Sequence, residues 1–241
     1  MHGPGTARAR VSVVVPTRNE RRNVEHLLAG LHPSHEVVLS DGGSVDGTVE
    51  AARLARPDCR VVAQGWNRGS SLLAGLHAAR GDVLVMLDAD GSTCPSEVPR
   101  MVAAITDGAD VVRSARATRR SPSETALAAV ASACLAATVT DPWCGTTALR
   151  RSVVPRLGLP DLTRHATEFE LLLVARAAAE GLAVREVPDV RAAPWHRPGP
   201  RPSVAETIRM LRTLRAERRS DRAHPVVPLP RTSVEGIADR S

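Results

Sequence analysis

Two aspartates, Asp88 and Asp90, stand one residue apart directly after an apolar stretch, in the segment VLVMLDADGST. The apolar stretch is typical of a buried strand, and Gly91 follows the second aspartate at once. Two carboxylates this close repel each other unless a cation or hydrogen-bond donors lie between them. Mg²⁺ and Mn²⁺ bind oxygen ligands, and proteins commonly hold them with one or two carboxylates together with substrate phosphates. The segment therefore predicts a divalent-metal site, although acidic loops at strand ends also occur without a metal.

Strands and helices alternate through the first half of the chain. Apolar runs predict five strands, with helical patterns between them, at residues 11–16, 36–40, 60–64, 82–87 and 109–115. Strands separated by helices form right-handed units with parallel strands. We therefore predict an α/β fold, with a mainly parallel, Rossmann-like sheet flanked by helices and a ligand site at the carboxyl ends of the strands.

The second half is less regular. Helices are predicted at residues 123–139, at 167–180 and at 202–219, the last of them amphipathic and basic, and a turn, a short strand and a helix start at 142–154. We predict one domain at 11–219, made of a first half (11–115) and a second half (116–219). A flexible tail (1–10) would precede it and a disordered tail (220–241) would follow.

The loops after the first two strands contain further candidate residues. PTRNE places Asn19 and Glu20 at the start of a helix, where such residues ordinarily serve as a cap. SDGGSVDGT places Asp41 before two glycines, where backbone can approach a ligand closely. Because Ser44 or Asp46 is expected to cap the next helix, Asp41 would be free to accept a hydrogen bond from a base or a ribose.

Positive charge in this chain is carried by arginine alone. The net charge is +6, and no lysine occurs in the sequence. Arg68, in the loop GWNRGSS after the third strand, stands at a helix start, where the guanidinium and the helix end together would hold a phosphate. A solvated arginine is the ordinary alternative, and the arginine bias also fits a GC-rich genome.

Composition limits the classes of function. Aromatic residues make up 2% of the chain, which leaves few rings for base stacking, so nucleic acid is not an expected partner. Four scattered cysteines argue against a zinc site or a disulfide framework and fit a reducing compartment. The longest apolar run, residues 126–139, is too short for a bilayer span of roughly 20 residues, and no signal peptide is recognisable. We expect a cytoplasmic protein, with peripheral contact at the inner face of the membrane left open.

Taken together, the loops resemble the family-two glycosyltransferases of GT-A fold, and most closely the branch of dolichol-phosphate mannose synthases and related bacterial enzymes. The resemblance covers residues 11–188, with a weaker match to 215, through SVVVPTRNE, SDGGSVDGT, NRGSSLLAGLHAARGD, VMLDADGST and VTDPWCGTTALRR. It implies inverting, metal-dependent transfer of a hexose from a UDP- or GDP-sugar, with Mg²⁺ or Mn²⁺ as cofactor. The acceptor would be a polyprenyl phosphate or a small molecule, and a homodimer is left open.

The resemblance also implies roles for residues on the donor side. Asp88 would hold the ribose and the sugar, and Asp90 would bind the metal. Arg68, where many relatives have a lysine, would face the diphosphate. Four residues would contact the nucleoside, with Asp41 on the base or ribose: Pro16, Asn19, Glu20 and Asp41.

On the acceptor side, relatives keep acidic residues where this chain has Asp141, Glu168 and Glu170. An alcohol acceptor must lose a proton, so a carboxylate is expected to serve as base, Asp141 being the first choice and Glu170 the second. A lipid phosphate is already ionised and needs positioning instead. His196 lies near a third metal ligand or diphosphate contact of some relatives, although its segment PWHRPGPRPS departs from their closing loop.

Two alternatives accompany this hypothesis. A nucleotidyltransferase also uses an acidic pair at a strand end, but it usually has a glycine-rich loop where this chain has PTRNE. A non-catalytic nucleotide or nucleic-acid binder would fit the isoelectric point of about 10.6. For a polyprenyl-phosphate acceptor, residues 126–139 and 209–219 would lie beside the bilayer, whereas plain packing is the ordinary interpretation of both helices.

Overall fold

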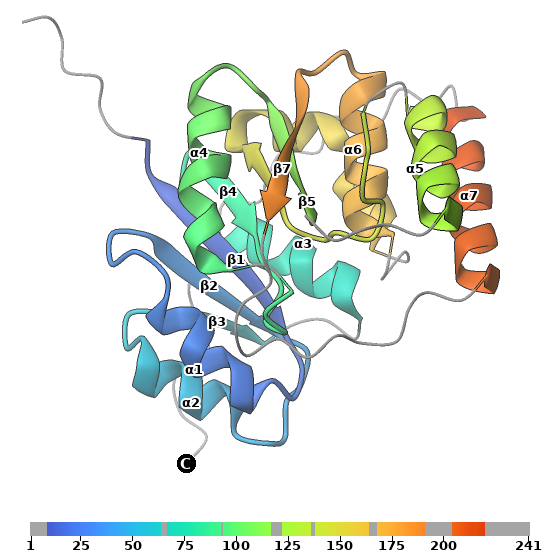
Figure 1. The fold of residues 1–241 in the computed structure, drawn as a ribbon. Coiled ribbons are helices and arrows are strands. Elements are labelled where there is room, and N and C mark those ends of the chain that lie inside the picture. Colours follow the sequence, from blue (N-terminus) through green and yellow to red (C-terminus); the bar gives the residue numbers. More distant parts are fainter. Residues whose placement is uncertain are drawn as a thin grey trace, which may run out of the picture.

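The structure, a computed structural model, describes residues 9–63, 67–92, 94–116, 122–135, 138–163, 168–190 and 204–219. Within these residues seven strands form one sheet in the order β3-β2-β1-β4-β6-β5-β7 (Figure 1). The strands are β1 (Val11–Thr17), β2 (Glu36–Asp41), β3 (Arg60–Ala63), β4 (Val83–Met86), β5 (Val111–Arg116), β6 (Thr147–Arg150) and β7 (Val184–Val190). Within this sheet β6 alone runs antiparallel to its neighbours, which confirms the predicted mainly parallel α/β architecture.

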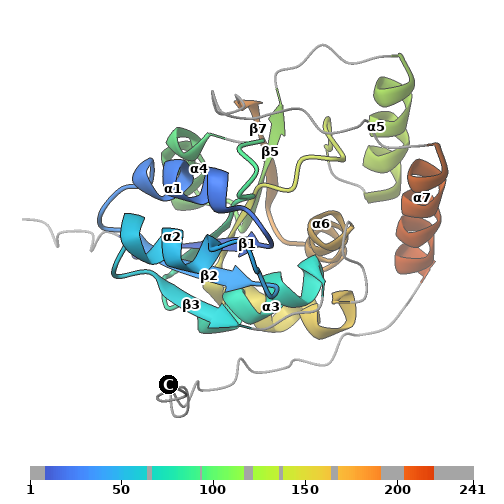
Figure 2. The ribbon, with the colours of Figure 1, turned by 90° about the horizontal axis from the view of Figure 1, so that it is seen from below.

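Helices cover both faces of the sheet (Figure 2). One face carries α1 (Arg21–Ala29), α2 (Thr48–Ala55) and α4 (Val98–Thr106), and the other carries α3 (Arg68–Ala78) and α6 (Phe169–Ala179). Side chains of β1 alternate between the two, since Val13 and Val15 belong to the first core and Val14 to the second. Two further helices, α5 (Pro122–Leu135) and α7 (Val204–Arg219), pack against each other and against α6. Short 3₁₀ turns complete the chain at Pro95–Glu97, Arg151–Leu157 and Leu159–Leu162.

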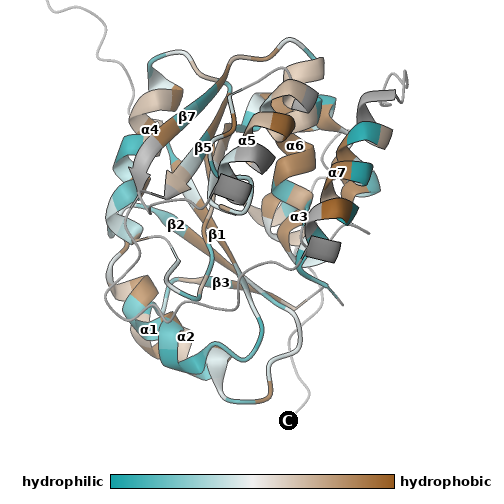
Figure 3. Cartoon of the chain, turned by 45° about the vertical axis from the view of Figure 1, so that its right-hand side comes forward, coloured by the Kyte–Doolittle hydropathy of each residue, from teal (hydrophilic) through white to brown (hydrophobic). Residues whose placement is uncertain are grey.

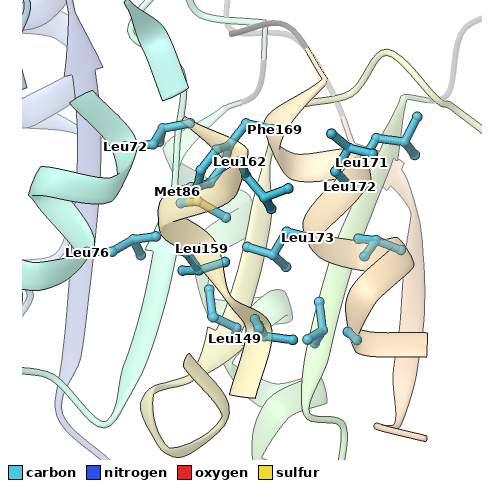
Figure 4. Close-up of a cluster of buried hydrophobic side chains, with 14 of the residues drawn as sticks. Leu72, Leu76, Met86, Leu149, Leu159, Leu162, Phe169, Leu171, Leu172 and Leu173 are labelled. Carbon is cyan, nitrogen blue, oxygen red and sulfur yellow. The ribbon is translucent and has the colours of Figure 1, made fainter. Parts of the chain in front are cut away.

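Leucine is the most frequent residue in the core beneath α3 and α6. Leu72 and Leu76 of α3 meet Leu172 of α6 and Met86 of β4 in one continuous cluster (Figure 4). Phe169, the single phenylalanine of the chain, is fully buried among them. This cluster fixes the start of α3 and the start of α6 on the same side of the sheet, and both helices begin with residues predicted to be functional.

One predicted helix requires correction. The helix predicted at 123–139 is described as helical only to Leu135. Val139 is buried outside the helix, and its backbone N–H and C=O are both hydrogen-bonded to the Ser132 hydroxyl (3.0 Å). Arg10, placed in the flexible tail, donates its backbone N–H to Asp82 (3.0 Å). The rest of that tail and residues 220–241 lie outside the described residues. The structure has no described helix long and apolar enough to cross a membrane.

Gly75 sets how closely α3 approaches β1. A Cβ atom there would collide with Cγ1 of Val14 and lie 3.3 Å from Cβ of Ser40. We expect Gly75→Ala to lower the free energy of unfolding by about 1–3 kcal/mol, since overpacking outweighs the gain in helix propensity. Urea unfolding measures this change. Gly30→Ala is the matched control, because its Cβ would lie 3.1 Å from Pro95 at a helix end; a loss of equal size there would contradict the overpacking explanation.

Candidate active site

A cavity of about 330 Å³ opens where β1, β2 and β4 end. Five of the predicted site residues line it: Pro16, Glu20, Arg68, Asp88 and Asp90. The remaining lining residues are Thr17, Arg18, Gly42, Asn67, Ser71 and Ala89. The predicted ligand site at the carboxyl ends of the strands is therefore a real hollow, and we name it the first cavity.

Carboxylates crowd one side of the first cavity. Gly91 has a φ of +77°, a left-handed conformation that turns the chain directly after Asp90, and Asp90 accepts a hydrogen bond from the Ser92 N–H (2.8 Å). Burial raises the pKa of the Glu20 carboxyl, and the negative charges of Asp90 and Asp88 raise it further. The side chains therefore carry excess negative charge that a cation would relieve.

The donor set fits a hard cation such as Mg²⁺ or Mn²⁺, because it consists of carboxylate oxygens. In the described part of the chain, however, no three metal-ligating side chains gather at one point. His196, the second predicted metal ligand, lies outside the described residues. The arrangement therefore fits a metal that shares its coordination between carboxylates and the phosphates of a ligand, and not an all-protein cage.

Arg68 joins the first cavity to a second one. An Asn67–Ser70 capping box fixes the start of α3, so Arg68 occupies its first turn. Its Nη2 atom lies 2.5 Å from Oδ1 of Asp88, and its Nη1 donates to Glu170 (2.7 Å). Burial alone would lower the pKa of Arg68, but Asp88 and Glu170 raise it well above the ordinary value, so the guanidinium stays charged.

The second cavity, of about 230 Å³, shares Arg68 and Asp88 with the first. Glu170, on the first turn of α6, lines it, and burial raises the pKa of Glu170 although Arg68 opposes the rise. Its other lining residues are Arg113, Pro142, Trp143, Cys144, Gly145 and Leu171. The two cavities thus meet at one ion-paired cluster.

Asp41 does not have the freedom that the sequence indicated. The carboxylate is buried and accepts four hydrogen bonds, from the Thr17 hydroxyl (3.0 Å), the Gly43 N–H (3.0 Å) and both the N–H and the hydroxyl of Ser44. The prediction that Asp41 has no local duty is therefore wrong. The two glycines fold the loop back onto the carboxylate, with Gly43 at a φ of +85°.

Asn19 stabilises the same loop through hydrogen bonds. It adopts a left-handed φ of +57°, accepts a hydrogen bond from the Val45 N–H (3.0 Å) and donates its own N–H to Ser44 (2.8 Å). Among the described residues, neither Asn19 nor Asp41 lines the first cavity. Both hold in place the loops that supply Pro16, Thr17 and Gly42.

The three acidic residues of the second half have different surroundings. Asp141 is buried, and its carboxylate accepts a hydrogen bond from the Trp143 N–H (3.2 Å). Glu168 forms an ion pair with Arg209 of α7 (3.2 Å). Of the three, only Glu170 lines either of these two cavities in the structure as described. Sequence analysis also missed Arg113, whose signal is a charged residue inside the apolar strand pattern ADVVRSA.

Residues 12–129 match the family model described as Glycosyl transferase family 2. The chain is similar to undecaprenyl-phosphate 4-deoxy-4-formamido-L-arabinose transferases. That of Edwardsiella ictaluri is 39% identical over 123 residues, covering 46% of this chain and 38% of the relative, and that of Pseudomonas paraeruginosa is 40% identical, covering 46% and 36%. The chain thus spans about two fifths of the length of the curated relatives that it matches.

Solved structures extend the likeness over most of the chain. Glucosyl-3-phosphoglycerate synthase of Mycobacterium tuberculosis is 26% identical, with a TM-score of 0.62, covering 87% of this chain and 79% of that one. The same protein in complex with Mn²⁺, UDP and glucosyl-3-phosphoglycerate is 23% identical, with a TM-score of 0.58, covering 90% and 84%. These neighbours confirm the GT-A fold. Most of the second cavity lies beyond residue 129, where the family match ends.

Proposed function

We propose that this chain, whose residues 12–129 match the model of glycosyltransferase family 2, is a member of that family and transfers a sugar from a nucleotide-sugar in the first cavity to an acceptor in the second. One observation carries this proposal: the two cavities meet at Arg68 and Asp88. A glycosyl transfer requires two ligands whose reacting atoms come together, and the shared residues lie where they would meet.

On the donor side, the nucleoside would rest against Pro16, Thr17 and Gly42, which Asp41 and Asn19 hold in place from behind. Asp90, with Asp88 and Glu20 beside it, would hold Mg²⁺ or Mn²⁺, whose chemistry is to neutralise the diphosphate leaving group. The M. tuberculosis synthase, whose complex contains Mn²⁺ and UDP, supports a divalent ion here. Arg68 would donate hydrogen bonds to the diphosphate.

In the transfer, an acceptor oxygen forms a bond to C1 of the sugar. The bond from C1 to the diphosphate oxygen breaks, and its electron pair leaves with the nucleoside diphosphate. A single in-line displacement inverts the configuration at C1. Where the acceptor is an alcohol, Glu170 would take the proton, because it lines the second cavity and its raised pKa suits a base. Asp141, the first choice from the sequence, fits this role less well because its carboxylate bonds its own loop.

Two acceptor classes are proposed, a polyprenyl phosphate and a phosphorylated small molecule. The first is named in the curated relatives and the second in the solved neighbours. The first would bring the protein into peripheral contact with a membrane. The buried side chains of α5 and α7, among them Ala131, Met210 and Leu214, are accounted for by helix packing, and hydrophilic residues interrupt the apolar ones along α7 (Figure 3).

A transfer assay tests the proposed function. UDP-, GDP- and dTDP-hexoses labelled in the sugar would be incubated with Mn²⁺ or Mg²⁺ and with farnesyl phosphate or 3-phosphoglycerate. We expect labelled product from one donor with one acceptor, abolished by EDTA. If none of the donors is hydrolysed or transferred with either metal, the nucleotidyltransferase or the non-catalytic binder becomes the better hypothesis.

A further inference from the structure

Arg113 of β5 is a buried charge with an incomplete set of partners. Arg113 is among the residues that line the second cavity, and it is 1% exposed. Nη2 donates to the backbone oxygen of Asp141 (2.7 Å), but Nε and Nη1 have no hydrogen-bond partner in the part of the chain that the structure describes. Buried donors in native proteins are nearly always bonded, and a charged group left unpaired is costly.

The carboxylates that neighbour Arg113 across the sheet and along the cavity wall accept hydrogen bonds from other donors. Glu186 is its direct neighbour across β5 and β7, yet the Glu186 carboxylate accepts from the backbone N–H and the hydroxyl of Thr140. Glu170 and Asp88, which line the same cavity, are paired with Arg68. The cavity therefore has one guanidinium whose charge its described neighbours already balance, and a second, Arg113, without an ion pair among them.

We propose that Arg113 is the receptor for a phosphate group of the acceptor, bound in the second cavity; this proposal rests on the proposed function. A guanidinium donates charge-assisted hydrogen bonds to phosphate oxygens, and Arg113 has two donors without partners, Nε and Nη1, to offer. The rest of the wall is partly apolar, from Pro142, Trp143 and Leu171, and would contact the carbon skeleton next to the phosphate. A volume of about 230 Å³ suits a head group or a small phosphate ester.

Thermal unfolding with inorganic phosphate as the probe tests this role. The protein is first titrated with UDP and with GDP in Mg²⁺, and the nucleotide that binds is kept saturating so that the first cavity is filled. We expect phosphate to raise the Tm of the wild type, and the apparent Kd for phosphate to rise at least tenfold in Arg113→Met. Arg113→Lys should show an intermediate Kd, because lysine keeps the positive charge but lacks the planar guanidinium with its several N–H donors.

The unliganded proteins separate binding from a structural role. Arg113→Met removes a buried, unpaired charge together with one hydrogen bond, so its Tm without phosphate should match or exceed that of the wild type. Arg176→Met is the matched control: Arg176 is equally buried but donates to the carbonyls of Leu157 and Gly158, so its Tm should fall while its response to phosphate persists.

Unchanged phosphate binding in both Arg113 variants would overturn the proposal, as would a fall in unliganded Tm equal to that of Arg176→Met. If no nucleotide binds the wild type, the proposed function fails, but the comparison with phosphate alone still decides the role of Arg113. Competition of phosphate by farnesyl phosphate in detergent micelles, against competition by glycerol 3-phosphate, distinguishes a lipid head group from a free phosphate ester.

Discussion

We expect Arg68→Met to lower kcat/KM for the nucleotide-sugar by about 10²- to 10⁴-fold. The loss follows from two charge-assisted hydrogen bonds to the diphosphate, each contributing about 1.5–3 kcal/mol. The same change leaves Asp88 and the buried Glu170 without their counter-charge. Breaking a fully buried pair costs about 3–5 kcal/mol, and because the Arg68 side chain is 31% exposed, we expect the free energy of unfolding to fall by about 2–3 kcal/mol. Steady-state kinetics and urea unfolding measure the two effects.

The double variant Arg68→Met/Glu170→Gln separates the two effects of Arg68. It removes the uncompensated buried carboxylate, so it should recover much of the lost stability while the affinity for the nucleotide stays low. Nucleotide binding is the measurement here, because Glu170 is also the proposed base and its loss would lower turnover by itself. Arg100→Met is the surface control, because Arg100 pairs with Glu97 at 2.9 Å and is 48% exposed, and it should change stability by less than about 1 kcal/mol. Near-normal kcat/KM in Arg68→Met would show that this arginine does not contact the diphosphate.

Gly145→Ala should lower the rate of transfer by about 100-fold, with a smaller effect on stability. A Cβ atom there would lie 2.7 Å from Oδ2 of Asp88 and 2.8 Å from Nη2 of Arg68. The ion-paired cluster where the two cavities meet would have to shift, and a displacement of about 1 Å in a reacting geometry costs about this much. Initial rates of transfer, compared with Tm values, measure the effect.

Gly30→Ala serves as the control here too, since its methyl group would meet a proline away from both cavities. We expect the activity of Gly30→Ala to match that of the wild type. Full activity in Gly145→Ala would mean that the Arg68–Asp88 contact is not part of the reacting geometry.

Local sequence patterns were sufficient for the strands and helices of the first half. Alternation of apolar runs with amphipathic helices gave β1 to β5 and the edge at which ligands bind, because these features depend on neighbouring residues. The position of β6 in the sheet could not be predicted from local patterns. Four residues from the second half insert between β4 and β5, and their pairing is fixed by contacts far away in the sequence.

The candidate site also contains residues that local patterns could predict and residues that they could not. Glu20, Arg68, Asp88 and Asp90 could be predicted, because strand ends of a parallel sheet meet at one edge. Whether a carboxylate faces a cavity or bonds its own loop depends on side-chain direction, which spacing does not reveal, so Asp41 was misinterpreted. Arg113 could not be predicted as a site residue, because neither its burial nor its lack of hydrogen-bond partners follows from the local strand pattern.

Nucleotide binding with and without metal tests the donor site most directly. Isothermal titration of UDP and GDP into wild type and Asp90→Ala, in Mg²⁺, in Mn²⁺ and in EDTA, would measure it, with Asp107→Ala as an exposed control outside the cavities. We expect one nucleotide to bind the wild type and Asp107→Ala only when metal is present, and to lose this affinity in EDTA and in Asp90→Ala. Binding that is unchanged by EDTA and by Asp90→Ala would contradict a metal-dependent donor site at the ends of β1 and β4.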